Sequence, residues 1–318
     1  MKKKYYITTP IYYPSAKPHM GHAYSSISAD FIARYKRLEG YDVTFVTGTD
    51  EHGQKIQKSA DKRKLSPDIF CNEISKVFLD LTKTLNLSNT DFIRTTEIRH
   101  HKTVQKLWNI LEKKKFIYLS KYSGWYSVSD EAFYTESEII EKDNIKLCEA
   151  SGSVVEWVEE ESYFFKLSEF QNLLIKHYED NPEFIQPSSR RNEVMSFVKG
   201  GLNDLSVSRN SFKWGISVPN SKDHIVYVWL DALTNYLTAT NYFDENFSWP
   251  ADVHIIGKDI LRFHAVYWPA FLLAAEIPLP KTIFGHGWIL SGDEKMSKSK
   301  GNILDPIEVV NEFGLDEI

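Results

Sequence analysis

Two histidines three residues apart lie near the start of the chain, and two lysines three residues apart lie near its end. His19 and His22 belong to the run PHMGH, and Lys295 and Lys298 belong to KMSKS, within the polar stretch Gly285–Asn302. Lysine is a compact charge on a flexible stem and suits phosphate. Taken alone, KMSKS could be a solvated surface loop, and the histidines could simply cap a helix. Together they predict a site for a triphosphate.

The elements around the histidines support this prediction. A strand pattern over Tyr5–Thr9 and a turn over Pro10–Pro14 precede them, and a helix pattern runs from about Ala23 to Glu39. Its apolar face is predicted from a four-residue repeat: Ala23, Ile27, Phe31 and Tyr35. A helix N-terminus offers unpaired N–H groups and partial positive charge, which attract anions.

Residue spacing adds detail to this anion site. His19 and His22 fall three apart on the first helical turn, so they share a face. Gly21 leaves room for a nucleotide to approach the backbone.

Carboxylates follow two buried strand patterns. Asp50 comes after the apolar run Val43–Thr47, and Asp259 comes after Val253–Ile256. Ligands of open α/β sheets bind at the carboxyl ends of strands. Asp50 can therefore hold a substrate ammonium, although capping a helix over Gln54–Arg63 is the alternative. Asp259 can accept hydrogen bonds from a ribose.

HxGH early and KMSKS late, in this order, resemble the class I aminoacyl-tRNA synthetases, and most closely their methionine-specific members. The resemblance spans Tyr5 to about Ile318. It implies an α/β fold: a Rossmann-type, doubly wound parallel sheet interrupted by a connective-peptide insertion domain. It also implies four segments. Residues 1–115 form the first half of the catalytic domain, 116–220 the insertion, 221–290 the second half, and 291–318 the KMSKS loop with the start of a helical region.

The resemblance also implies the site residues. Four are expected to be catalytic: His19, His22, Lys295 and Lys298. The ATP-binding set is His19, Gly21, His22, Asp259, Lys295 and Lys298. The methionine-binding set is Ile11, Tyr13, Asp50, Trp229, Ala232, Tyr236 and His264. From the residues alone, Trp229 and Tyr236 could equally be core aromatics after a strand over Ile225–Leu230, but a polarizable thioether favours aromatic contacts.

A zinc knuckle is common in the insertion of this family, and here its ligands are replaced. Ser127 and Asp130 stand where cysteines are expected, and only Cys148, followed by Ser151, remains downstream. A structural zinc site needs four Cys or His ligands. We therefore expect no structural zinc, with packing or hydrogen bonds in its place.

The activity implied is methionine activation by ATP, accompanied by Mg²⁺, and transfer of the methionyl group to tRNA(Met), including the initiator tRNA. Synthetases for valine, leucine, isoleucine or cysteine are alternatives, but the insertion Phe116–Asn220 is short for an editing domain. A small-molecule nucleotidyltransferase and a silent tRNA-binding module are further alternatives. Intact HxGH and KMSKS motifs argue against a silent module.

Composition limits the remaining possibilities. The 318 residues carry a net charge of −5 and two cysteines, Cys71 and Cys148, so a reducing cytoplasm is expected, with no DNA or membrane partner. No run is apolar enough to span a membrane, and the start, MKKK, resembles neither a signal nor a transit peptide. The anticodon-binding bundle of the family is expected to be absent. His100 and His101 are predicted to lie at the surface.

Overall fold

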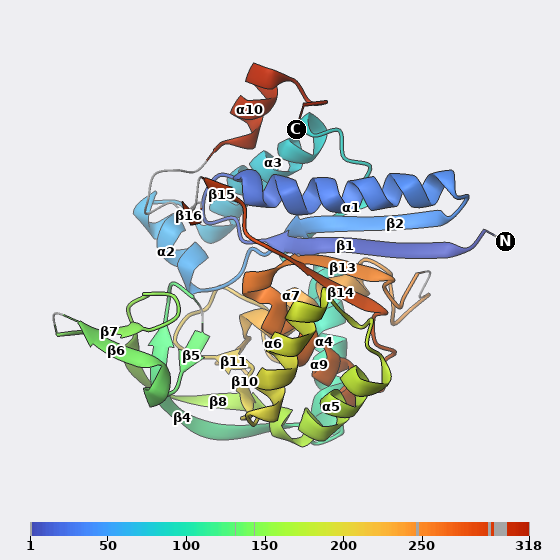
Figure 1. Cartoon of the computed structure of the whole chain (residues 1–318). Helices are drawn as coiled ribbons and strands as arrows, with labels where there is room; N and C mark the ends of the chain where they lie inside the picture. Colours follow the sequence, from blue (N-terminus) through green and yellow to red (C-terminus); the bar gives the residue numbers. More distant parts are fainter. Residues whose placement is uncertain are drawn as a thin grey trace.

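A parallel sheet of six strands forms the centre of the molecule (Figure 1). The structure is a computed structural model and describes residues 2–130, 132–142, 144–245, 248–291, 294–295 and 304–317. In spatial order the strands are β3 (Asp91–Arg94), β2 (Asp42–Thr49), β1 (Lys4–Tyr12), β13 (Val253–Gly257), β14 (Thr282–His286) and β9 (Ile185–Gln186). The predicted α/β class with a parallel Rossmann-type sheet is confirmed.

Strand β1 lies at the point where the strand order reverses. Its Ile7 is opposite Phe45 of β2 and Val253 of β13. All three side chains are buried because helices cover both faces of the sheet, which explains the near-continuous apolar runs. The carboxyl ends of β1 and β13 therefore border the crevice in which such sheets bind ligands.

Helix α1 (Met20–Leu38) covers one face of the sheet (Figure 1). Its buried face carries small residues, and Ala29 and Ala33 pack with Ile7 and Phe45. Small side chains let the helix lie close to the strands. The predicted apolar face is confirmed at Ala23 and Ile27, which pack in one cluster, but it is wrong beyond them, because the Phe31 side chain is 72% exposed and Tyr35 is 52% exposed.

Several more helices and short strands complete this region. Helix α3 packs against α1 and α10 through a small cluster that includes Leu81 and Ile307. The helices and short strands of this region are α2 (Gln54–Lys62), α3 (Pro67–Thr84), α10 (Pro306–Phe313), β15 (Leu290–Ser291) and β16 (Glu294–Lys295).

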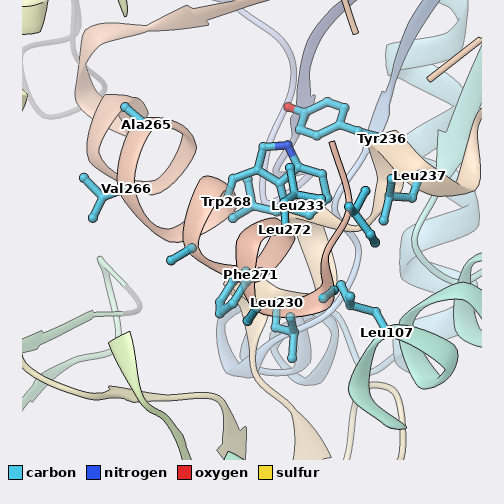
Figure 2. Packing of buried hydrophobic residues seen from close by; sticks show 14 of the residues in the cluster. Leu107, Leu230, Leu233, Tyr236, Leu237, Ala265, Val266, Trp268, Phe271 and Leu272 are labelled. Carbon is cyan, nitrogen blue, oxygen red and sulfur yellow. The ribbon is translucent and has the colours of Figure 1, made fainter. Parts of the chain in front are cut away.

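The main hydrophobic core lies on the opposite face. Figure 2 shows its side chains around Trp268, whose ring centroid is 6.0 Å from that of Tyr236. The helices that contribute include α4 (Ile98–Lys113), α5 (Gln171–Asp180), α6 (Ser188–Lys199), α7 (Val228–Leu233), α8 (Asn235–Thr238) and α9 (Trp268–Ala275). A π-helical turn, Phe263–Tyr267, precedes α9.

The strand predicted over Ile225–Leu230 is wrong for most of its length. Only Ile225–Val226 forms a strand, β12, which pairs with β11 (Ser208–Arg209). Helix α7 begins at Val228, and the helical turn buries both Leu230 and Leu233 in the main core. Packing thus overrides the β-propensity of this run.

An antiparallel sheet forms most of the predicted insertion. Its strands are β10 (Leu205–Ser206), β8 (Glu156–Phe165), β4 (Ile117–Ser127) and β5 (Ala132–Tyr134), beside a hairpin of β6 (Ile139–Lys142) and β7 (Ile145–Cys148). Helices α5 (Gln171–Asp180) and α6 (Ser188–Lys199) then flank β9, which pairs with β14. The segment 116–220 therefore contributes one strand to the central sheet.

Within the ranges described, none of the helices is both apolar enough and long enough to span a bilayer.

Candidate active site

A cavity of about 490 Å³ opens at the carboxyl ends of β1 and β13. It is lined by the N-terminus of α1, the loop after β2, helices α7 and α8, and the segments after β13 and β14. Eleven of the residues predicted from sequence line it: Ile11, Tyr13, His19, Gly21, His22, Asp50, Trp229, Ala232, Tyr236, Asp259 and His264. Residues more than 200 positions apart in the chain thus meet at one place.

The two predicted lysines are placed differently. Lys295 belongs to β16, which pairs with β15 through Leu290. Lys298 lies outside the described residues.

His19 and His22 form the start of α1. His19 is the N-cap, and its Nδ1 accepts a hydrogen bond from the Gly21 amide at 3.0 Å. His22 Nδ1 accepts from the His19 amide, also at 3.0 Å, which completes a capping box. In a neutral ring the proton must then reside on Nε2. Both imidazoles, whose centroids are 3.9 Å apart, therefore present an N–H donor suited to a phosphate oxygen.

Gly21 makes this arrangement possible. A Cβ at this position would lie 2.8 Å from Cε1 and 2.9 Å from Nδ1 of His19. Any larger residue would displace the His19 ring.

His286 adds a third histidine that was not predicted as a site residue. Its Nδ1 lies 2.8 Å from the Gly287 carbonyl, so Nδ1–H donates there and Nε2 accepts from the Ser25 hydroxyl at 2.7 Å. This bond connects α1 to the last residue of β14. The sequence signal was present, because the run GHGW ends a strand.

At the other end of the cavity, Tyr236 and His264 are hydrogen-bonded. His264 Nδ1 lies 3.0 Å from the Ile260 carbonyl and donates to it, so Nε2 accepts from the Tyr236 hydroxyl at 2.8 Å. Burial lowers the pKa of His264 from 6.5 to about 4. The imidazole is therefore neutral at pH 7, and this end of the cavity carries no charge from it.

Aromatic rings form the wall beside this pair. Trp229 stacks on Phe263 with centroids 3.5 Å apart and planes inclined by 12°. Ala232, one helical turn after Trp229, leaves space between this stack and Tyr236. The wall is apolar and polarizable, as a thioether requires.

Asp50 lies at the end of β2, next to the turn before α2. Its side chain is buried, and its amide donates to the Tyr12 carbonyl at 2.9 Å. Helix α2 begins with Gly53 as N-cap, so the alternative role of Asp50 as its cap is wrong.

Asp259 follows β13 in a short 3-10 turn. The absence of a side chain at Gly257 makes room for it, because a Cβ there would lie 2.6 Å from Asp259 Oδ1.

The comparisons with known proteins agree with this geometry. Residues 5–318 match the family model described as tRNA synthetases class I (M). The chain belongs to this family. Its similarity to individual members extends over its whole length.

The class I synthetase domain is 56% identical to the methionine--tRNA ligase of Rickettsia conorii, over 100% of this chain and 63% of the relative. It is 55% identical to that of Rhizobium meliloti, over 99% of this chain and 62% of the relative. The Mycobacterium tuberculosis methionyl-tRNA synthetase, solved in complex with methionyl-adenylate, superposes with a TM-score of 0.96 at 52% identity. That match covers 99% of this chain and 63% of the other. The chain thus spans somewhat over 60% of the length of these relatives.

The predicted insertion, residues 116–220, contributes to the lining of the cavity. Ser129 and Asp130 line its mouth, which sequence reasoning missed. The Asp130 carboxylate accepts hydrogen bonds from Ser151 at 2.6 Å, Ser153 at 2.8 Å and Tyr134 at 2.8 Å.

Three of the four positions at which the sequence suggests a lost zinc knuckle are joined by hydrogen bonds. The Asp130 amide donates to Ser127 Oγ at 3.3 Å, and Cys148 is buried. Among the described residues no group of three or more His, Cys, Asp or Glu could hold a metal ion. Hydrogen bonds therefore link Ser127, Asp130 and Ser151.

His100, predicted at the surface, is fully buried. Its partner is Asp231, 131 residues further along the chain, which sequence spacing could not reveal.

Proposed function

We propose that this chain is the catalytic portion of a methionine--tRNA ligase. The observation that supports this most strongly is the single cavity lined by eleven residues expected to bind methionine and ATP. Relatives that are 55–56% identical and bear this name add support.

The first step is the formation of methionyl-adenylate. A carboxylate oxygen of methionine attacks the α-phosphorus of ATP, a new P–O bond forms, and the bond to pyrophosphate breaks. The carboxylate is already a nucleophile, so no general base is needed. Catalysis then depends on positioning and on stabilising the charge that develops on the phosphate.

The side chains divide this work. The Nε2–H groups of His19 and His22 donate to the phosphates, and Asp259 accepts from the ribose. Asp50 holds the methionine ammonium. Lys295 and Lys298 are proposed to neutralise the departing pyrophosphate. Mg²⁺ would arrive bound to the ATP phosphates.

The thioether occupies the apolar end of the cavity. We assign it the wall formed by Ile11, Tyr13, Trp229, Ala232, Tyr236 and His264. A neutral His264 suits an uncharged side chain. One methylene group changes the binding free energy by only about 1–3 kcal/mol. The rejection of smaller amino acids therefore depends on how completely the methionine side chain fills the space beside this wall.

The second step would transfer the methionyl group to the 3′ end of tRNA(Met), including the initiator tRNA. The proposed compartment is the cytoplasm, because both cysteines are buried free thiols.

The test is methionine-dependent exchange of labelled pyrophosphate into ATP, with valine, leucine and cysteine as controls. Exchange with methionine alone is expected. Exchange with another amino acid would indicate a different synthetase. If the folded protein showed no exchange with any amino acid, that result would contradict the proposal.

A further inference from the structure

Three polar side chains meet in the protein interior outside the cavity. Asp231 and His100 are fully buried, and His52 is 4% exposed. His52 Nδ1 lies 2.6 Å from one carboxylate oxygen of Asp231, and His100 Nε2 lies 2.8 Å from the other. Buried charge is costly unless it is paired, so this group needs an explanation.

The proton positions follow from the chemistry. Burial by itself would raise the pKa of Asp231, but His52 and His100 beside it hold that pKa below its ordinary value. Asp231 is therefore an ionised carboxylate, which only accepts hydrogen bonds. Both imidazoles must donate to it, and each of its oxygens has one donor.

These bonds connect the two ends of the proposed methionine pocket. His52 is two residues after Asp50, in the loop that follows β2. Asp231 lies in α7, between Trp229 and Ala232, and all three pocket residues line the cavity whereas His52 and Asp231 do not. The hydrogen bond between His52 and Asp231 thus joins the loop that carries Asp50 to the helix that carries Trp229 and Ala232, outside the cavity.

The residue between Asp50 and His52 is fixed independently. The Glu51 carboxylate is fully buried and accepts from Arg94 at 2.7 and 3.0 Å, from Ser75 at 2.5 Å and from Thr96 at 2.6 Å. The Glu51 amide donates to Thr95 at 2.8 Å. The loop is therefore held on one side by α3, β3 and the segment after β3. On the other side it is held by Asp231, which binds the His52 side chain, and by Trp214, whose Nε1–H donates to the Glu51 carbonyl at 2.5 Å.

We propose that Asp231 is a positioning residue that sets Asp50 at a fixed distance from the side-chain pocket, by holding His52 with one carboxylate oxygen. His100 holds the other oxygen and fixes the carboxylate on α7. The inference rests on the proposed function, because it concerns the binding of an amino acid by its ammonium and its side chain together. A shift of about 1 Å in such a contact can reduce rates about a hundredfold.

The test compares methionine with 4-(methylthio)butanoate, which has the same carboxylate and thioether but no amino group. In Asp231→Asn one oxygen becomes an N–H₂ group, which cannot accept from an imidazole N–H. We expect the KM for methionine in pyrophosphate exchange to rise about tenfold or more, as for loss of a charged hydrogen bond. The KM for ATP and the inhibition constant of the analogue should change by less than about twofold.

A second pair of variants covers the possibility that Asp231→Asn does not fold. In His52→Asn the amide N–H₂ can replace Nδ1–H, so the methionine KM should stay near that of the wild type. His52→Leu lacks the donor and should raise this KM as Asp231→Asn does. The matched control is His224→Leu, which removes a buried imidazole hydrogen-bonded to Ser208 at 3.0 Å, away from the cavity; it should leave the methionine KM unchanged.

Equal losses for methionine, the analogue and ATP would mean that Asp231 only supports the fold, and would overturn the inference. So would a His52→Leu variant with an unchanged methionine KM. Failure of the proposed function is distinguishable, because the wild-type chain itself would then show no methionine-dependent exchange.

Discussion

The histidines at the two ends of the cavity carry their ring proton on different nitrogens. At one end, backbone amides donate to Nδ1 of His19 and His22, so the proton of each neutral ring is on Nε2. At the other end, a carbonyl accepts from Nδ1 of His264, so Nε2 becomes an acceptor for Tyr236. The same residue type is thus a donor at Nε2 at one end and an acceptor at Nε2 at the other, which suits the phosphates and the apolar side chain of the proposed function.

Tyr236→Phe tests the second arrangement. The change removes the hydroxyl that donates to His264, whose Nε2 remains buried. An unsatisfied buried acceptor costs about 1–3 kcal/mol, so the urea midpoint should fall and the methionine KM should rise. Chemical denaturation and pyrophosphate exchange measure the two effects. Tyr35→Phe, at a half-exposed site, is the control and should change neither. An unaltered Tyr236→Phe variant would contradict the assigned bond.

The pH dependence of stability follows from His264. Burial holds its folded pKa at about 4, against 6.5 in an unfolded chain, so below pH 6.5 the unfolded state binds a proton that the folded state does not. The free energy of unfolding should therefore fall as the pH drops from 6.5 to 4, by about 3 kcal/mol from this residue. Buried His254, whose pKa is also lowered by burial, should act in the same direction.

Urea titrations at several pH values measure this slope. His264→Gln removes the titrating group and should make the slope shallower between pH 6.5 and 4. An equally steep slope in the variant would show that His264 does not contribute.

Among the elements, long patterns were predicted well and short ones were not. The strands β1, β2 and β13 and the start of α1 were found because apolar runs and turn residues mark them. Strand β9 has only two residues, Ile185 and Gln186, and no periodic signal. Its place in the sheet depends on pairing with β14, which local sequence cannot show.

In the candidate site, residues that belong to a local motif were predicted, and residues brought there by tertiary structure were not. Residues on motifs that end strands or begin helices, such as His19 and Asp50, were predicted from their position. His100 was placed at the surface because its partner lies far along the chain. Ser129 and Asp130 were missed as lining residues because the orientation of the insertion is a tertiary property.

Gly48→Ala tests how closely β2 and β3 pack. A Cβ at Gly48 would lie 2.0 Å from the backbone oxygen of Ile93, the residue paired with it in β3. Backbone cannot move aside cheaply, so we expect a loss of at least about 1–3 kcal/mol, measured as a lower urea midpoint. The control is Gly287→Ala, where a Cβ would meet nothing within 4 Å, and its midpoint should match the wild type. Equal midpoints for both variants would contradict the close approach at Gly48.

At the scale of the whole molecule, the Asp130 hydrogen bonds join parts of the predicted insertion beside the cavity. We expect metal analysis of the purified chain to give far less than one zinc per molecule, and a chelator to leave the unfolding curve unchanged. Asp130→Ala removes the acceptor shared by Ser151, Ser153 and Tyr134. Amide exchange should then accelerate over residues 127–153, while β1 stays protected. One zinc per chain would contradict this account.

The position of β1 has a consequence for the way the protein is made. Ile7 pairs with Val253, 246 residues later, so on the ribosome one edge of β1 has no partner until most of the chain has been synthesised. At about 5–20 residues per second this edge waits for roughly 10–50 s. An open strand edge can pair with another chain, so we expect the nascent protein to depend on chaperones during this interval. Arrested nascent chains of about 200 residues should be cleaved by protease near β1, and chains that include β13 should resist. The first strand of the sheet to be synthesised would thus complete its pairing only after β13 has been made.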